Sequence, residues 1–281
     1  MNVSTVALSL ILRGVLGLVR SSCVQDDGAY FCDEIPQSYP DGLSSLVLRG
    51  HNVGVLNSTV FISENLGSVT RLTIQDAGIT EVTSGALKSF HNLKTLNLGL
   101  NLLSQLSPAW FSQPAILQTL TLNRNNITVL EESMLLRLTG LTNLNLAGNM
   151  IQNIGPTTFF NKTRLASLDL SNNGIQNISP GTFSGLAGLT LLNLTGNKIT
   201  VVSPDCFSSL TGLTYLDLSD NRLSSINPQA LPLISTRIRL DRNPWNCSCG
   251  VEDFVVFLRG WSVMPLLLGS KDQSCGLNAM R

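Results

Sequence analysis

An eleven-residue pattern, L-x-x-L-x-L-x-x-N-x-L, recurs along this chain and limits its possible folds more than any other feature. It is clearest at residues 165–175 and starts again at residues 93, 117, 141, 189 and 213, so consecutive copies begin 24 residues apart. A fixed period in the twenties with this pattern predicts a solenoid, in which each repeat forms one coil. We therefore expect one elongated domain, although 281 residues would otherwise suggest one or two globular domains.

The leucines at positions 1, 4, 6 and 11 of the pattern can all be buried only if the copies stack. If each Leu-x-Leu segment lies on a short strand, neighbouring copies pair as parallel strands about 4.8 Å apart. Each repeat then buries its leucines against the next repeat, and the ends of the stack require caps. Two degenerate repeats start at Leu43 and Val69 and have His51 and Ala77 in place of asparagine, as is typical of terminal repeats.

The asparagine at position 9 is expected to be structural. The chain turns inward after the strand and leaves backbone polar groups in the core, which the side-chain amide can bond. Leaving such a group unpaired costs about 1–3 kcal/mol, so we expect a ladder of asparagines and not a binding site. Its members are Asn101, Asn125, Asn149, Asn173, Asn197, Asn221 and Asn243.

Positions 16 and 19 carry a second regular pattern. Proline at position 16 fixes a turn without donating a hydrogen bond, and phenylalanine or leucine at position 19 predicts a column of stacked core side chains. We therefore expect no long helices on the convex side. The prolines are Pro108, Pro156, Pro180, Pro204 and Pro228, and the position-19 residues are Leu87, Phe111, Leu135, Phe159, Phe183, Phe207 and Leu231.

Residues 1–22 resemble a secretory signal peptide, because apolar runs from Val6 to Leu12 and from Gly14 to Val19 precede small serines. Arg13 interrupts the apolar region, and a short buried or anchoring segment is the alternative. Cysteine usage also favours export. Cys23 and Cys32 precede the first repeat and Cys247, Cys249 and Cys275 follow the last. Such clusters are typical of disulfide-stapled caps made in an oxidising compartment, whereas the Cys-x-Cys spacing disfavours a structural zinc site.

The residues Asn243-Pro244-Trp245-x-Cys247-x-Cys249 follow the repeats. This motif resembles the C-terminal flanking cap of the extracellular leucine-rich-repeat family, which includes Toll-like receptors, Slit proteins, the Nogo receptor and lamprey variable lymphocyte receptors. With the repeats, the resemblance spans residues 23–281. It implies a leucine-rich-repeat solenoid, an α/β horseshoe with a parallel β-sheet on the concave face. Loops, turns and short 3-10 segments would form the convex face, with disulfide caps at both ends.

The resemblance also implies the cysteine pairing. A reduced N-terminal cap would hold a Cys23–Cys32 bridge, and Cys247 would pair with Cys275, which leaves Cys249 without a partner. Cys206 lies more than one repeat away on the far side of the coil, beyond the reach of a bridge. We therefore expect Cys206 to be unpaired, the partner of Cys249 to lie beyond Arg281, and the chain to be a fragment of a longer protein.

The expected organisation follows from these features. It comprises a signal peptide at residues 1–22, an N-terminal cysteine cap at 23–42, eight repeats of mostly 24 residues at 43–234, and a last partial repeat with a C-terminal cysteine cap at 235–281. Asn-x-Ser/Thr sequons predict N-glycosylation at Asn57, Asn126, Asn161, Asn177 and Asn193, and Asn246 lies beside a cap cysteine that would hinder modification. Asn193 occupies position 5, so its glycan would lie on the concave face.

The concave face is the expected recognition surface, since solenoids usually bind there. Its outward positions are mostly small and uncharged, whereas interfaces derive their energy from Tyr, Trp and Arg anchors. The candidate binding residues therefore gather near the C-terminal end: Tyr215, Asp169, Asp217, Asp220, Arg237, Arg239 and Arg242. The same charges could instead satisfy one another across adjacent strands, and this alternative stays open.

The sequence favours a non-enzymatic extracellular recognition protein, namely the ligand-binding ectodomain of a cell-surface receptor or adhesion protein. A secreted matrix or modulatory protein without an anchor is the alternative. The sequence contains no phosphate loop. His51 and His91 are its only histidines, so no His-Glu metal pair or catalytic triad is visible either. We therefore expect no cofactor and no metal. Equal numbers of basic and acidic residues, 18 each, make a protein ligand more plausible than a nucleic acid. A membrane contact would need a segment outside this chain.

Overall fold

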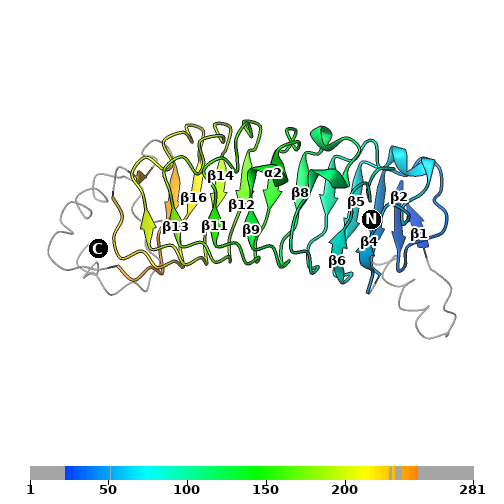
Figure 1. Cartoon of the computed structure of the whole chain (residues 1–281), viewed down its shortest axis with the longest axis horizontal. Helices are drawn as coiled ribbons and strands as arrows, with labels where there is room; N and C mark the ends of the chain where they lie inside the picture. The colour runs from blue at the N-terminus through cyan, green and yellow to red at the C-terminus, as the bar shows by residue number, and fades with distance from the viewer. Residues whose placement is uncertain (1–22, 51, 228–229, 232–235, 246–281) are drawn as a thin grey trace.

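Each repeat contributes one short strand, and these strands lie side by side along the long axis of the molecule (Figure 1). The computed structural model describes residues 23–50, 52–227, 230–231 and 236–245. In the main sheet the strands follow one another as β1 (Cys23–Asp26), β2 (Ala29–Cys32), β3 (Ser45–Leu48), β5 (Arg71–Ile74), β7 (Thr95–Asn97), β8 (Thr119–Thr121), β10 (Asn143–Asn145), β12 (Ser167–Asp169), β14 (Leu191–Asn193), β16 (Tyr215–Asp217) and β17 (Arg237–Arg239). From β2 onward all neighbours are parallel, which confirms the predicted solenoid.

A hairpin closes the N-terminal end of the sheet. β1 and β2 are antiparallel, and a disulfide joins Cys23 to Cys32, which lie opposite each other. The turn between the strands places Asp27 and Gly28 at φ 42° and 74°, a left-handed conformation that Asp and Gly adopt more readily than most residues. Because β2 pairs in parallel with β3, the cap covers the edge that the first repeat would otherwise leave open.

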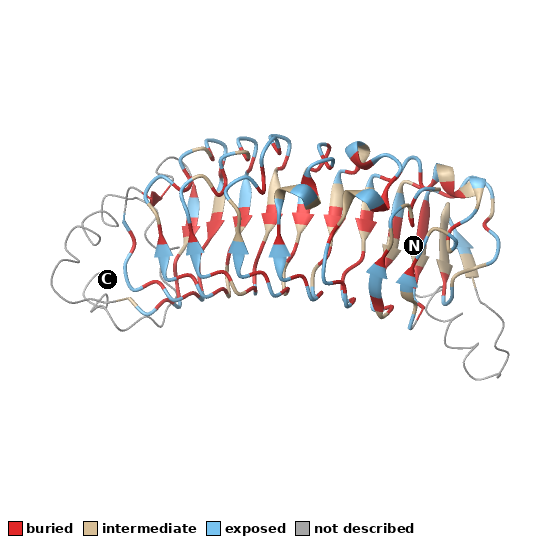
Figure 2. Cartoon of the chain, in the orientation of Figure 1, coloured by how far each residue is buried: buried red, intermediate tan, exposed pale blue. Residues whose placement is uncertain are grey.

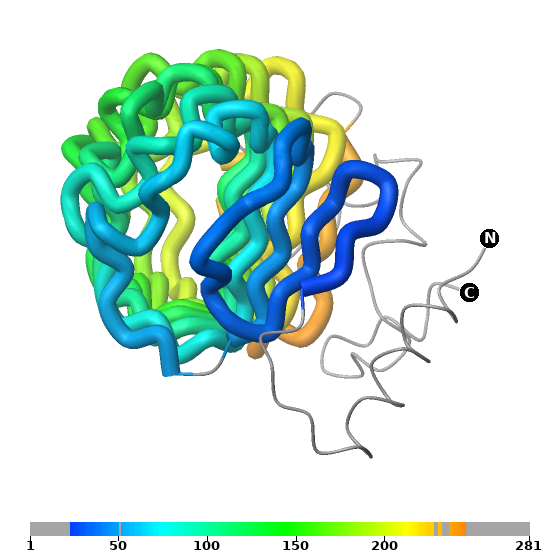
Figure 3. Tube along the Cα trace, turned by 90° about the vertical axis from the view of Figure 1, so that its right-hand side faces the viewer, coloured from blue at the N-terminus to red at the C-terminus, as the bar shows by residue number. Residues whose placement is uncertain are grey.

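The pattern leucines fill the interior of the coils. In the clearest repeat, Leu165, Leu168, Leu170 and Ile175 are at most 1% exposed. In the three-residue strands β7, β8, β10, β12, β14 and β17 a buried central residue lies between two more exposed ones (Figure 2), as expected when one face packs on a core. Viewed along the axis, successive coils overlie one another around that core (Figure 3).

The position-9 asparagines bond backbone groups of two coils at once. Asn173 Oδ1 accepts a hydrogen bond from Ile151 N at 3.0 Å, and its Nδ2 donates to Leu146 O at 3.0 Å and to Leu170 O at 3.1 Å. The same contacts recur at Asn101, Asn125, Asn149, Asn197, Asn221 and Asn243. All seven side chains are buried, so each supplies partners that the backbone of the neighbouring coil lacks.

On the opposite side of the coils, short parallel strands join some neighbours in pairs. β4 (Gly54–Leu56) pairs with β6 (Ile79–Val82), β9 (Val129–Leu130) with β11 (Asn153–Ile154), and β13 (Asn177–Ile178) with β15 (Val201–Val202). Within the described ranges, no such pairing joins β6 to the next coil or β11 to β13. The second layer of strands therefore joins only some pairs of neighbouring coils.

Turns and short helices complete the convex side. They are η1 (Glu64–Ser68), η2 (Pro108–Trp110), η3 (Pro114–Ile116) and α2 (Glu132–Leu135). In the coils that follow these helices, Phe159, Phe183 and Phe207 stack, with successive ring centroids 6.1 and 5.8 Å apart. The aromatic column and the short helical segments match the expectation drawn from positions 16 and 19.

Position 8 adopts a left-handed backbone after most strands, a feature that sequence analysis did not anticipate. Its φ lies between 51° and 69° in seven described repeats and in the last partial repeat, at Asp76, Leu100, Arg124, Gly148, Asn172, Gly196, Asp220 and Arg242. The left-handed residue turns the chain away from the sheet toward the core asparagine. Position 8 therefore belongs to the turn and not to the flat part of the concave face.

Cys206 is a buried free thiol at position 18 of its repeat. The expected C-terminal cap cysteines (Cys247, Cys249 and Cys275), the sequon at Asn246, the signal peptide and His51 lie outside the described residues. Within the described ranges, no helix has the length and hydrophobicity required to cross a bilayer.

We predict that Asn149→Ala lowers the free energy of unfolding by about 3 kcal/mol. The substitution removes the partners of Ile127 N, Leu122 O and Leu146 O in the core, and each unpaired buried group costs about 1–3 kcal/mol. Guanidinium denaturation followed by circular dichroism measures the loss. The control, Asn153→Ala at an exposed position of β11, should change stability by less than about 0.5 kcal/mol. Equal losses in the two variants would contradict the structural role of the ladder.

We also predict that Cys206 resists alkylation in the folded protein. Burial raises the pKa of its thiol to about 12, and only the thiolate reacts. At pH 8 we expect iodoacetamide to label Cys206 at least about 100-fold more slowly in the native protein than in guanidinium. Mass spectrometry of the peptide that contains Cys206 measures both rates, and similar rates would show that the thiol is accessible.

Candidate ligand-binding face

The outward side chains of the main sheet form rows, because the strands pair in register. Threonines at position 2 use their hydroxyl groups within the fold. Thr142 Oγ1 donates to Gln118 O at 3.1 Å, Thr190 Oγ1 to Ala166 O at 2.9 Å, and Thr214 Oγ1 to Thr190 O at 2.9 Å. Each bond joins one coil to the preceding coil. These threonines therefore reinforce the stack.

Side chains at position 5 also serve the fold. Their oxygens accept a hydrogen bond from the backbone N–H two residues later, which is the geometry of an Asx turn. The bonds measure 2.9–3.2 Å and involve Asn97, Asn145, Asp169, Asn193 and Asp217. This row ends each strand and directs the chain into the left-handed residue at position 8.

Position 3 forms the row with the most unused binding capacity. Its members are Arg71, Thr95, Thr119, Asn143, Ser167, Leu191, Tyr215 and Arg237, and each lies opposite the next in the sheet register. Arg237 is exposed, and its guanidinium has no ion pair or hydrogen bond with any described residue. Leu191, next to Tyr215, is 36% exposed. An aromatic ring, an aliphatic side chain and a free cation thus lie on consecutive strands.

Asp217 is the centre of a polar network at the C-terminal end of the sheet. Tyr215 OH donates to Asp217 Oδ2 at 2.9 Å, and Ser219 N donates to Asp217 Oδ1 at 3.0 Å. Arg239 Nη1 lies 3.4 Å from Asp217 Oδ2, and its Nη2 lies 3.0 Å from Asp241 Oδ2. Both carboxylates are buried, so their charges require these partners.

The network keeps its members in defined protonation states. Burial, followed by the hydrogen bond to Asp217, raises the pKa of Tyr215. The hydrogen bond to Asp241, followed by that to Tyr215, raises the pKa of Arg239. Tyr215 therefore remains a hydrogen-bond donor and Arg239 remains a cation at neutral pH. Because Arg239 is partly exposed, its ion pairs stabilise the fold less than their short distances suggest.

The candidate binding residues separate into two groups. Asp217 and Arg239 contact each other, as the alternative of self-satisfied charges anticipates, and Arg242 approaches Asp241 at 3.6 Å. Among the described residues, Asp169, Asp220 and Arg237 form no ion pair, and Asp169 is two strands from Asp217. Sequence analysis missed Asp241. Its position two residues after Arg239 places both side chains on one side of an extended segment, a signal that was available.

A hollow of about 400 Å³ lies on the concave face between β8 and β16. Thr121, Asn145, Asp169, Leu191, Asn193 and Tyr215 are among the residues that line it. It combines hydroxyl, amide and carboxylate groups with one aromatic and one aliphatic side chain. Such a lining suits a polar ligand that also has an apolar face.

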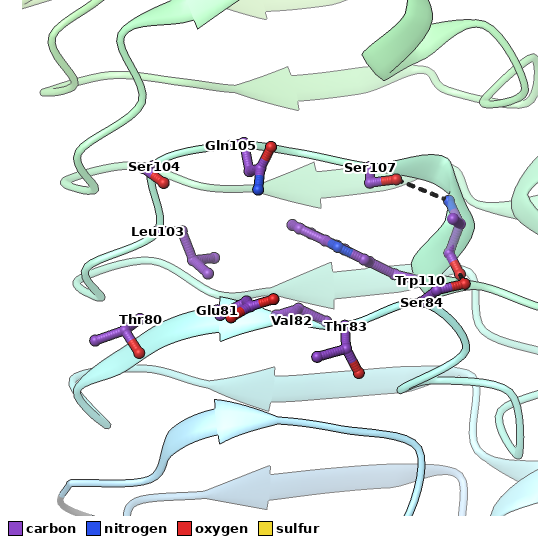
Figure 4. Close-up of a pocket in the computed structure, with 11 residues that line it drawn as sticks. Thr80, Glu81, Val82, Thr83, Ser84, Leu103, Ser104, Gln105, Ser107 and Trp110 are labelled. Carbon is purple, nitrogen blue, oxygen red and sulfur yellow. Dashed lines mark hydrogen bonds between the residues drawn. The ribbon is translucent and has the colours of Figure 1, made fainter.

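A second hollow, of about 360 Å³, separates residues 80–84 from residues 103–107 on the side of the solenoid (Figure 4). Trp110 extends from η2 into this gap. Trp110 is at position 18 of its repeat, and in other repeats this position holds smaller residues, including Ala86, Thr158 and Thr182. Because Trp110 is only 2% exposed, its ring offers little surface to a ligand. The concave hollow is therefore the stronger candidate site.

No group of three or more His, Cys, Asp or Glu side chains in the described part of the chain is arranged to hold a metal ion. His91 Nδ1 lies 3.5 Å from Ser112 Oγ on the surface, longer than the roughly 2.6–3.2 Å typical of a nucleophile and its base.

The sequons differ in their surroundings. Asn57, Asn126, Asn161 and Asn177 are exposed, whereas Asn193 is partly buried in β14 on the concave face. A glycan at any of the four exposed sites would extend directly into solvent.

We predict that Asp217→Ala destabilises the protein by about 2–3 kcal/mol. The variant leaves Ser219 N and Tyr215 OH without their buried acceptor, and such losses cost about 1–3 kcal/mol each. The control, Asp220→Asn, keeps a residue type that tolerates the left-handed turn and should change stability by less than about 0.5 kcal/mol. Thermal unfolding of both variants checks the prediction. An unchanged Asp217→Ala melting temperature would show that the network is not structural.

Comparison with known proteins gives one family and several similar structures. The family model described as "Leucine rich repeat" matches residues 67–127, 115–174, 139–199, 163–223 and 189–233, which together cover more than half of the chain. The search of curated proteins gives no match.

Two of the many solved structures that resemble this chain illustrate the likeness. One is TLR13 in a complex with ssRNA13, with 30% sequence identity, a TM-score of 0.67, and coverage of 72% of this chain and 29% of that chain. This chain thus spans less than a third of that protein. The other comes from an octameric complex of Latrophilin 3, Unc5D and the LRR region of FLRT2, with 22% identity, a TM-score of 0.62, and coverage of 88% and 90%. At that identity the second likeness shows the fold alone.

Proposed function

We propose an extracellular recognition function for this chain, which belongs to the leucine-rich repeat family because the family's repeat model matches more than half of its length. The observation that carries the proposal is the row of position-3 side chains. The Asn and Asp side chains at position 5 and most threonines at position 2 are bonded within the fold, whereas position 3 keeps an exposed arginine, a leucine and a tyrosine on adjacent strands. A ligand could bind these groups without breaking any bond that holds the coils together.

A protein is the partner we propose. The chain has zero net charge and only 13% charged residues, whereas nucleic-acid binding depends mainly on cations that neutralise phosphates. Tyrosine and arginine, which supply most of the energy in protein interfaces, meet at Tyr215 and Arg237. The TLR13 likeness supports an RNA ligand as the second candidate, because that structure contains ssRNA13.

We propose that the chain is exported and acts outside the cell. The Cys23–Cys32 disulfide, the apolar residues 1–22 and the exposed sequons support this location. The ectodomain of a cell-surface receptor or adhesion protein fits these features, and a secreted matrix or modulatory protein fits them equally well. The proposed binding face serves either form.

We expect Arg237→Ala and Tyr215→Phe/Arg237→Ala to weaken binding of a protein ligand by about tenfold or more, as is typical when interface anchors are truncated. The wild-type chain, secreted from mammalian cells, would first be screened against an array of extracellular proteins and a panel of single-stranded RNAs. Surface plasmon resonance would then compare the variants on the hits.

Arg222→Ala is the matched control, because Arg222 is exposed but lies in a turn outside the position-3 row. Its affinity should equal that of the wild type. Equal weakening in both arginine variants would remove the proposed site, and RNA hits without protein hits would replace the proposed partner class.

A further inference from the structure

Asn193 is the one partly buried sequon asparagine among those that the structure describes. Its Oδ1 accepts a hydrogen bond from Thr195 N at 3.2 Å. Its Nδ2 makes no hydrogen bond with any described residue, and the side chain lines the concave hollow. The Asx turn therefore fixes the amide oxygen and leaves the nitrogen free, and this nitrogen is the atom that N-glycosylation modifies.

We propose that Asn193 carries an N-linked glycan whose first N-acetylglucosamine occupies the concave hollow of this solenoid. The inference rests on the proposed export, because the modification takes place in the secretory pathway. The nitrogen Nδ2 forms a bond to the anomeric carbon of the sugar and loses one proton. At the same time the bond from that carbon to the diphosphate of a polyprenyl-linked oligosaccharide donor breaks, so that polyprenyl diphosphate is released and the proton lost by the nitrogen balances its new negative charge.

The lining of the hollow matches the chemistry of this sugar. Thr121, Asn145 and Asp169 offer hydrogen-bond partners for hydroxyl and acetamido groups, and Leu191 and Tyr215 offer an apolar contact for the sugar ring. Tyr215 is held in place by its hydrogen bond to Asp217, so its ring is oriented before the sugar arrives. The hollow of about 400 Å³ thus offers a preorganised place for a covalently attached ligand.

Position 5 carries a sequon only in this repeat. Asn97 and Asn145 occupy the same position but are followed two residues later by Gly99 and Ala147. Where a serine follows, as in the repeats on either side of β14, position 5 is aspartate and not asparagine. Thr195 also bonds the next coil, since its Oγ1 lies 3.0 Å from Ser219 O. The sequon threonine is therefore built into the stack.

The glycan would limit the direction from which a partner reaches the proposed binding face. Arg237 does not line the hollow and stays uncovered. The sugar would cover the side of the Tyr215 ring that faces β14. The side that faces β17 would stay exposed. The sugar would cover Leu191 on β14, so a protein ligand would approach from the C-terminal end of the sheet and bind Tyr215 and Arg237 of the proposed face.

The test uses the full chain secreted from mammalian cells. Peptide-N-glycosidase in H₂¹⁸O converts each glycosylated asparagine to ¹⁸O-labelled aspartate, which mass spectrometry assigns site by site. We expect Asn193 to be occupied and its glycan to be released at least about tenfold more slowly from the native protein than the glycan of exposed Asn126. After denaturation the two rates should be equal.

Two substitutions at one residue supply the controls. Thr195→Val removes the sequon and keeps the side-chain shape, so label at Asn193 should disappear. Thr195→Ser keeps both the sequon and the hydroxyl group, so label should persist. In the Tyr215→Ala variant, native release from Asn193 should accelerate if the ring holds the sugar.

The possible results are distinct. An unmodified Asn193 beside an occupied Asn126 would overturn this inference and leave the proposed export intact. Equal native release rates would show a glycan that does not occupy the hollow. Absence of glycans at every sequon of a secreted protein would overturn the inference as well, whereas failure of secretion would count against both the inference and the proposed extracellular function.

Discussion

The structure depends on satisfying backbone groups that become buried whenever the chain turns inward after a strand. A coil that returns every 24 residues cannot pair all of these groups with its own backbone. The asparagine at position 9 supplies the missing donors and acceptor, as the bonds of Asn173 to Ile151, Leu146 and Leu170 illustrate. The leucines fill the core, and this amide pairs the buried backbone groups of the turn that leads from the strand into it.

The three outward rows of the main sheet have different tasks. Threonines at position 2 connect neighbouring coils, and Asn or Asp at position 5 ends each strand, so most side chains of these rows are already engaged. Position 3 has no comparable duty, which makes it the place where sequence can vary without a change of fold. One residue per coil can therefore determine what the concave face binds. The specificity of binding then arises from the order of the position-3 residues across the strands.

Much of this fold was predictable from sequence, because its period, its buried leucines and its asparagines are local signals repeated many times. The left-handed residue at position 8 was not predictable in the same way, since Leu100 and Arg124 occupy it as well as Gly148. The polar network was anticipated only in part. Asp217 and Arg239 are in register, but the choice of Asp241 over Asp220 depends on the turn, which moves position 8 off the face. The hollow arises from side-chain size over several strands, and no motif encodes it.

The paired strands behind the main sheet have a mechanical consequence. β4 with β6, β9 with β11, and β13 with β15 each bind two coils together on both sides of the core. At the junctions between these pairs, for example between β11 and β13, the described coils are joined by the front sheet and the core without a rear strand pair. Such junctions are seams. Each of the three rear pairs therefore holds two coils together on both sides of the core, and bending would be resisted most strongly within these two-coil units.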